Sequence, residues 1–295
     1  MKNHPVAYAI LLSLAAYSSY AFGDAIGKHV AMAGLSPFQI SFAYSTIAFL
    51  FLLAFSARLG GFRSLLTTKY KKLHIYRALM FAPTQALNYY AFSKLPMANV
   101  YTVLFMTPFI TTILAHYLID EKTSFRTWIC ILGGFAGVLI VNRPDIYNLD
   151  WPLLACAVSA LFGASRFIVA RKMGYNESAF TLSIAPCISI MLVSLIPAMM
   201  AETPSLDRSM LWLVLGGFFF AGGTLFISLS LLQKVNLSLL TPFHYSQIVW
   251  GLLFGVVFFS DRPDLYTWVG CGLIILSGIA LVYTKEKKAK DRDAV

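Results

Sequence analysis

Long apolar stretches dominate this sequence and constrain its fold more than any other feature. A helix that spans a bilayer needs about 20 mostly apolar residues at a rise of 1.5 Å per residue. Ten stretches meet this length, and they are apolar on nearly every helical face rather than along one stripe. The sequence therefore predicts an all-α membrane protein with ten transmembrane helices. The stretches are 6–27, 37–57, 74–93, 97–119, 126–142, 151–170, 179–201, 209–231, 235–259 and 265–284.

The composition excludes several classes of protein. Hydrophobic residues make up 58% of the 295 residues and charged residues only 12%, about half the charge of a typical soluble domain. An ordinary water-soluble enzyme, a disordered chain and a nucleic-acid-binding module are therefore excluded. All four cysteines lie inside apolar stretches, where neither a disulfide framework nor a thiolate metal site is expected. We predict no metal and no cofactor.

The distribution of Lys and Arg predicts the orientation. Sixteen of the 23 lie on one side of the predicted bundle and five on the other. This bias places both termini and the loop 58–73 in the cytoplasm of a multi-pass plasma (bacterial inner) membrane protein. The net charge of +10 is thus a topology signal and does not indicate nucleic acid. The other two, Arg77 and Arg166, lie within about one turn of cytoplasmic helix ends, so we predict that their head groups snorkel to lipid phosphates.

The chain repeats itself weakly at a shift of 140 residues, with five predicted spans in each half. An odd number of spans forces the second half to enter the membrane from the opposite side. The result is an inverted repeat, in which substrate binds near the midplane between the halves. We predict a first five-helix half at 1–143, a second at 144–284 and a basic cytoplasmic tail at 285–295. Matching positions are Lys94 with Lys234, Glu121 with Asp261, Lys122 with Arg262, and Thr127-Trp128 with Thr267-Trp268.

Several short motifs resemble one known family. They are His74-Ile75-Tyr76-Arg77, Tyr90-Ala91-Phe92, Lys94-Leu95-Pro96-Met97-Ala98-Asn99, Thr107-Pro108-Phe109, a Leu-x-x-Glu ending at Leu118 and Glu121, and Gly133, Gly134 and Gly137. With these motifs the chain resembles the drug/metabolite transporter superfamily, in its EamA-type ten-helix branch, over roughly residues 6–284. The resemblance implies that helices one, three, four, six, eight and nine enclose a transport pathway.

Two positions depart from the family pattern. The acid that closes span nine is usually Glu and here is Asp261, which keeps the chemistry similar. Some relatives that resemble S-adenosylmethionine importers carry Ala-Pro-Tyr-Arg-Tyr-x-Glu in span nine. This chain reads Thr241-Pro242-Phe243-His244-Tyr245-Ser246-Gln247. The charged pair is missing at these positions, which weighs against S-adenosylmethionine as the substrate.

Asp24 is the only carboxylate inside a predicted span. A charge at the bilayer centre costs about 2.5–3.5 kcal/mol on insertion scales, so this residue needs a reason to be there. One interpretation is a salt bridge with Lys28, which lies four residues later on the same helical face. The other makes Asp24 a proton or cation site that faces a central cavity. The sequence leaves both open.

Span nine holds the densest polar cluster, and we predict that it forms a cavity wall. Pro242 has no N–H to donate and disrupts the preceding turn, which frees carbonyls for a ligand. The alternative is a kinked helix whose polar groups pair with neighbouring helices. Span four has its own proline, Pro108, with a tyrosine nearby. The candidates in these two spans are Tyr101, His244, Tyr245, Gln247 and Trp250, with Pro108 and Pro242 as helix breaks.

Span three adds Gln85, Asn88 and Tyr89, which share a helical face by their i, i+3, i+4 spacing. Amide and phenol groups between aromatic walls suit an uncharged or zwitterionic small molecule with a ring or an amide. Trp250 and the tyrosines are also able to hold a cation, which would be a different ligand class.

The leading functional prediction is a secondary transporter without enzymatic activity. It would move a small polar metabolite (amino acid-, nucleoside- or S-adenosylmethionine-like) by alternating access, coupled to protons or by exchange. The alternative is a membrane-embedded enzyme or a scaffold. A single intraspan carboxylate disfavours the enzyme, and polar residues at mid-depth disfavour the scaffold. The expected partners are a small-molecule substrate and the lipid bilayer, and a homodimer is left open.

Overall fold

The computed structural model describes residues 5–118, 124–143, 150–173, 177–202, 209–233 and 241–293. All regular elements within these ranges are helical. The all-α prediction is confirmed for this part of the chain. The helices are α1 (Pro5–Met32), α2 (Pro37–Ala54), α3 (Ser56–Leu59), α4 (Phe62–Thr67), α5 (Lys71–Lys94), α6 (Met97–Leu104), α7 (Met106–Leu118), α8 (Phe125–Asn142), α9 (Trp151–Met173), α10 (Ala179–Met200), α11 (Ser209–Leu231), the 3₁₀ helix η1 (Thr241–Tyr245), α13 (Ser246–Phe259) and α14 (Leu265–Asp293).

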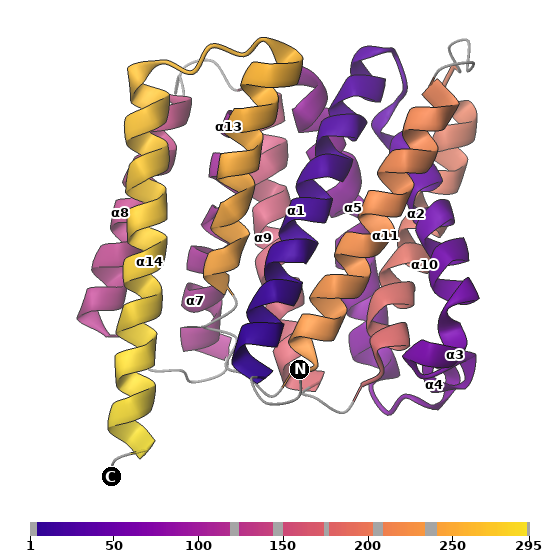
Figure 1. The fold of residues 1–295 in the computed structure, drawn as a ribbon, viewed down its shortest axis with the longest axis horizontal. Coiled ribbons are helices and arrows are strands. Elements are labelled where there is room, and N and C mark those ends of the chain that lie inside the picture. Colours follow the sequence, from indigo (N-terminus) through magenta and orange to yellow (C-terminus); the bar gives the residue numbers. More distant parts are fainter. Residues whose placement is uncertain are drawn as a thin grey trace.

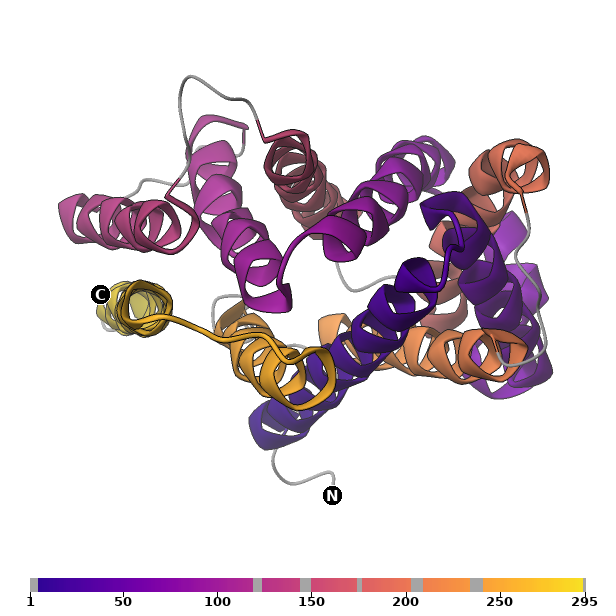
Figure 2. The same cartoon turned by 90° about the horizontal axis from the view of Figure 1, so that it is seen from above.

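The long helices stand side by side as one bundle (Figure 1). Viewed from above, the bundle is elongated, with α8 and α14 at one end and α2 and α10 towards the other (Figure 2). Between these end pairs, α1 packs on α11 and α5 packs on α9. The helix α1 begins on the side of the bundle where α14 ends (Figure 1).

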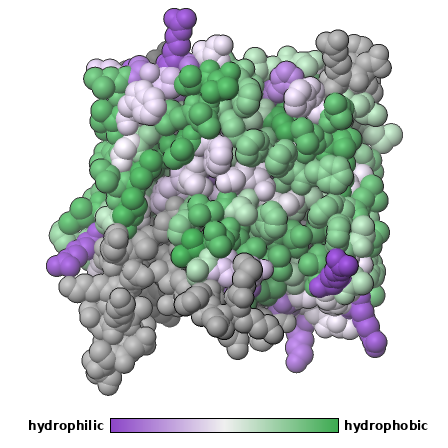
Figure 3. Space-filling view, viewed as in Figure 1, coloured by the Kyte–Doolittle hydropathy of each residue, from purple (hydrophilic) through white to green (hydrophobic). Residues whose placement is uncertain are grey.

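The outer surface has the character of a lipid-facing surface. Hydrophobic residues cover most of the visible sides, and strongly hydrophilic side chains project at the upper and lower edges (Figure 3). Large apolar side chains such as Leu192, Ile196 and Leu211 are more than 60% exposed, which suits a bilayer and not water. Within the described residues, six helical segments are long and apolar enough to cross a membrane, and three further apolar helices are shorter. The predicted number of ten spans stays a prediction.

Packing between the helices is reciprocal under the 140-residue shift. This shift relates α1 to α9 and α5 to α11, and the contacts pair α1 with α11 and α9 with α5. Equivalent helices also pack antiparallel. Gln39, near the start of α2, donates to the carbonyl of Ala201 just after α10 ends (3.3 Å). In the middle of α8, Gly133 faces Ser277 of α14, and Gly137, which comes later in α8, faces Gly270, which comes earlier in α14. The two halves therefore pack with opposite directions.

Predicted span four is interrupted, because α6 ends at Leu104 and α7 begins at Met106. The cause is Pro108, whose ring clashes with the carbonyl four residues earlier and which cannot donate to it. That carbonyl belongs to Leu104, where α6 ends. The described part of span nine opens with η1, which contains Pro242, and continues as α13. Residues 234–240, including Lys234 of the repeat, lie outside the described residues, as do Glu121 and Lys122.

Two segments predicted as a loop and a tail contain helix. The loop 58–73 includes α4 and parts of α3 and α5, and α3 and α4 both pack on α10. The predicted tail from residue 285 continues α14 as far as Asp293. Both segments therefore contain more regular structure than predicted, and the orientation that the Lys and Arg distribution indicates stays a prediction.

Candidate functional site

A central cavity of about 140 Å³ lies where the two halves meet. One water needs roughly 10–15 Å³ measured in this way, so the cavity has room for a small molecule. Its walls come from α1, α5, α6 and α7 of the first half and from α9, α11, η1 and α13 of the second. The lining residues are Tyr17, Tyr20, Asp24, Arg77, Phe81, Thr84, Gln85, Asn88, Leu104, Thr107, Ser159, Gly163, Arg166, Phe167, Ala170, Ile227, Leu231, His244 and Gln247.

Five of the nine predicted pathway residues line this cavity. They come from both halves of the chain: Asp24, Gln85 and Asn88 from the first, and His244 and Gln247 from the second. The folded chain therefore brings together three groups of candidates that lie up to 223 positions apart in the sequence.

The other four predicted residues pack beside the cavity instead of lining it. Tyr101 donates to Asp24 Oδ2 (2.9 Å). Tyr89 is 1% exposed and lies against Tyr44. Trp250 Nε1 donates to Ser18 Oγ (3.0 Å). The fourth residue, Tyr245, packs against the rings of Phe105 and Phe109. These four side chains pack behind the residues that line the cavity.

The salt bridge between Asp24 and Lys28, one of the two interpretations that the sequence left open, does not form. Lys28 Nζ donates instead to the carbonyl of Leu95 (2.9 Å) and lies 4.7 Å from the centre of the Phe259 ring. Asp24 keeps one hydrogen bond, from Tyr101, and faces the cavity. The structure thus agrees with the interpretation that places this carboxylate at the cavity.

The prediction that Arg77 and Arg166 snorkel to lipid phosphates is wrong, because both line the cavity. Arg77 is only 7% exposed and donates to the carbonyl of Leu182 (3.0 Å). The guanidinium of Arg166 lies 3.8 Å from the centre of the Phe81 ring. The prediction considered the depth of each residue along its helix but not the face on which it lies.

Helical spacing could have identified both arginines. On α5 the lining residues follow the pattern i, i+4, i+7, i+8, i+11, and on α9 the same pattern recurs. Extending the face of Gln85 and Asn88 by two turns towards the start of α5 reaches Arg77. The two sets are Arg77, Phe81, Thr84, Gln85 and Asn88 on α5, and Ser159, Gly163, Arg166, Phe167 and Ala170 on α9.

Contacts across the cavity join the two halves. The hydroxyl of Ser159 on α9 donates to Asn88 Oδ1 on α5. The ring of His244 stacks on Tyr17 of α1, with 4.7 Å between ring centres and 22° between planes. Tyr20 donates to Thr224 Oγ1 on α11 (3.3 Å). A movement of one half against the other would therefore change the walls of the cavity.

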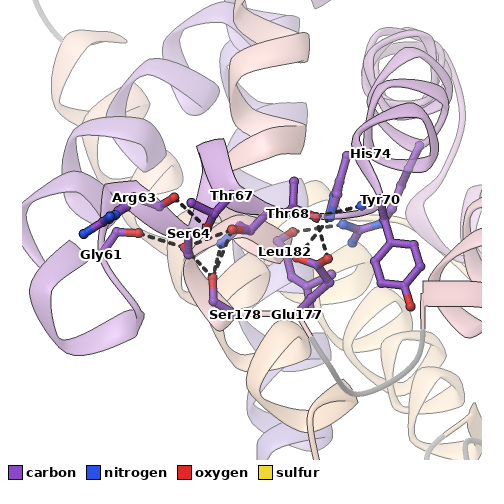
Figure 4. A network of polar contacts seen from close by, with 12 residues as sticks. Gly61, Arg63, Ser64, Thr67, Thr68, Tyr70, His74, Glu177, Ser178 and Leu182 are labelled. Carbon is purple, nitrogen blue, oxygen red and sulfur yellow. Dashed lines mark hydrogen bonds and ion pairs between the residues drawn. The ribbon is translucent and has the colours of Figure 1, made fainter.

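A second polar cluster, the α4–α10 network, lies near the start of α5 and consists of Ser64, Thr68, His74, Glu177 and Ser178 (Figure 4). Thr68 donates to Glu177 Oε1 (2.6 Å), and His74 Nε2 lies 3.3 Å from Glu177 Oε2. The hydroxyls of Ser64 and Ser178 are 2.7 Å apart. Ser178 also accepts from the Thr181 amide (3.0 Å) and caps α10. The network ties the α4–α5 segment of the first half to the start of α10 in the second.

Within the described residues, no group of three or more His, Cys, Asp or Glu side chains is placed to hold a metal ion. The polar side chains that face the cavity carry hydroxyl, amide, imidazole, carboxylate and guanidinium groups, and they lie among apolar residues such as Phe81, Leu104 and Ile227. Such a mixture binds a polar organic molecule through hydrogen bonds and charge.

The fold and the cavity define a class of protein. A helical membrane bundle with two oppositely directed halves and a polar cavity between them is the architecture of secondary transporters. The family model for the EamA-like transporter family matches residues 7–143 and 150–284. The chain belongs to this family, and the resemblance seen in the sequence is confirmed.

Named relatives are transporters of small molecules. The S-adenosylmethionine uptake transporter of Rickettsia conorii is 26% identical over 285 residues, which cover 96% of this chain and 93% of the relative. The riboflavin transporter of Vibrio cholerae is 23% identical over 296 residues, which cover 98% and 97%. A crystal structure that is 15% identical superposes with a TM-score of 0.71, covering 95% of this chain and 98% of that one, and supports the fold.

Proposed function

We propose that this protein is a secondary transporter that carries a small polar metabolite across the plasma membrane by alternating access. The observation that carries the proposal is the polar cavity at the junction of the two halves, lined from both sides of the repeat. In such a transporter the halves rock about a fixed central site, which opens to each side in turn. Ten spans in an inverted repeat, with both termini in the cytoplasm, complete the proposed topology.

The substrate class follows from the cavity wall. Amide, hydroxyl and charged groups alternate with aromatic rings, which suits a polar molecule with a planar or apolar part. Relatives at similar identity are named for S-adenosylmethionine and for riboflavin, two molecules that share a polar chain attached to a fused ring system. We propose a metabolite of this kind, and the energy source is a proton gradient or exchange with a second metabolite.

The test is flux in proteoliposomes that contain the purified protein. Uptake of labelled amino acids, nucleosides, vitamins and S-adenosylmethionine is measured with and without a pH gradient, against liposomes without protein. We expect saturable uptake of at least one compound. If no compound enters faster than into empty liposomes, the transporter proposal fails, and a membrane-embedded enzyme or scaffold takes its place.

A further inference from the structure

The central cavity has two chemically different ends. Arg77 on α5 and Arg166 on α9 lie at one end. Gln85 is eight residues further along α5 than Arg77, and Ser159 is seven residues before Arg166 on α9. At 1.5 Å per residue, the guanidinium end and the amide and hydroxyl end are therefore about 10–12 Å apart along the helices. Asp24, seven residues after Tyr17 on α1, belongs to the second end.

Neither arginine has a carboxylate partner among the described residues. The ion pairs found there are His74 with Glu177 and Arg143 with Asp264. Arg77 donates only to a backbone carbonyl, and Arg166 Nε is buried without a hydrogen-bond partner in this part of the chain. Buried cations that lack a counter-ion are costly in a membrane protein and mark functional sites. An anionic ligand would supply the missing charge.

The contacts of Arg166 leave it able to bind an anionic ligand. Its guanidinium lies over the Phe81 ring, 3.8 Å from the ring centre, a contact that attracts the cation to the face of the ring. A guanidinium held in this way has N–H groups left to donate, and an edge of two N–H groups matches two oxygens of a carboxylate or a phosphate. The stacked rings of Tyr17 and His244, which also line the cavity, offer a flat wall for an apolar or planar part of the same ligand.

We propose that Arg77 and Arg166 bind an anionic group, a carboxylate or a phosphate, of the molecule that the cavity transports. The opposite end, with Asp24, Gln85 and Asn88, receives the hydrogen-bond donors of the same molecule. The transported molecule is then an organic anion or a zwitterion with its negative group towards the start of α5. This inference rests on the proposed transport function and adds the substrate class to it.

The test compares pairs of probes that differ in one anionic group. Adenosine is compared with adenosine monophosphate, and tryptophanamide with tryptophan, by binding to the full-length protein in phosphatidylcholine nanodiscs and by counterflow in proteoliposomes. We expect the wild type to bind the anionic member of at least one pair about tenfold more tightly, as for a hydrogen bond to a charged group. Arg166→Gln removes this preference, and Arg166→Lys keeps part of it because the charge remains.

Arg63→Gln is the matched control, because Arg63 is exposed on α4 and does not line the cavity. It should leave both binding and counterflow unchanged. Arg77→Gln is a weaker test, because it also removes the hydrogen bond to Leu182 and can lower stability. A thermal unfolding curve for each variant separates a loss of binding from a loss of fold.

The outcomes separate this inference from the transport function. Counterflow of neutral probes with no preference for the anionic member, or a preference that survives Arg166→Gln, overturns the arginine site and leaves the transporter intact. Absence of counterflow for every probe counts against transport itself. Nanodiscs that contain phosphatidylglycerol form a further arm. If only this lipid stabilises the protein through Arg166, and neither soluble anion does, the arginines bind a lipid headgroup and the substrate role is wrong.

Discussion

The cavity and the α4–α10 network are both polar and both buried between the halves, but their hydrogen bonding differs. In the network, the Glu177 carboxylate accepts from Thr68 and lies 3.3 Å from His74 Nε2, although neither ring nitrogen of His74 makes a hydrogen bond within the described residues. In the cavity, Arg166 has no carboxylate beside it in this part of the chain, and its Nε makes no hydrogen bond there. A carboxylate with a hydrogen-bond donor and a basic neighbour holds two segments together, whereas a buried charge without a partner in a cavity is completed by water or by a ligand. We therefore expect the network to hold the halves together, and we propose the cavity as the part that recognises a molecule.

The largest expected effect comes from removing the acid of the cavity. Asp24→Asn should abolish uptake driven by a pH gradient, because the amide cannot take up and release a proton. The side chain still accepts from Tyr101, so the melting temperature should change little. Uptake in proteoliposomes and thermal unfolding measure the two effects.

Tyr101→Phe is the control for this substitution, because it removes the hydrogen bond to Asp24 and leaves the carboxyl group in place. We expect it to keep uptake but to shift its pH profile. Unchanged, still pH-dependent uptake by Asp24→Asn would show that Asp24 carries no proton in transport.

The next largest effect is on stability and tests the network. Glu177 and His74 are 5% and 6% exposed, and removal of one partner from a buried pair costs about 3–5 kcal/mol. Glu177→Ala should therefore lower the free energy of unfolding by roughly 3 kcal/mol. The double variant His74→Ala/Glu177→Ala should lose less than the sum of the single variants. Denaturant titration of the protein in detergent measures each value.

Thr67→Ala controls for the α4 position, since Thr67 is exposed and its hydroxyl bonds only within its own helix. A loss for Glu177→Ala no greater than for this control would mean that the network does not hold the halves together. The expected difference between the network, which stabilises the fold, and the cavity, which binds a ligand, would then not hold.

A smaller effect is expected from the neutral side chains of the cavity. Gln247 is 5% exposed and lines the cavity with His244 one turn away. A net hydrogen bond contributes about 0.5–1.5 kcal/mol, so Gln247→Ala or His244→Ala should weaken ligand binding by about two- to tenfold. The thermal shift that a bound metabolite produces measures this loss. A full shift in both variants would remove span nine from the binding site.

Part of the fold and of the candidate site could be predicted from the sequence, through helical spacing and the internal repeat. The 140-residue shift predicted two related halves, and the spacing of Gln85 and Asn88 predicted a polar face that lines the cavity. The depth of Arg77 and Arg166 along their helices gave a wrong prediction, because depth does not specify whether a side chain faces lipid or a neighbouring helix. The choice of Leu95 as the partner of Lys28 was also not predictable, since it depends on how α1 packs against the end of α5.

The smallest effect is expected at the opposite end of the molecule from the network, where Arg143 and Asp264 form an exposed ion pair at 2.6 Å. Hydrogen bonds from Thr267 and the nearby Arg143 hold the pKa of Asp264 below its ordinary value. The stabilisation is therefore present above the ordinary pKa of a carboxyl group and is lost as the pH falls through the lowered one. Because exposed pairs are screened by solvent, Arg143→Ala should lower the melting temperature at neutral pH by less than about 2 °C. Asp264→Ala should lower it more, because it also removes the cap on the first turn of α14. If Arg143→Ala were as damaging as Glu177→Ala, the distinction between a buried contact that joins the halves and an exposed one would fail.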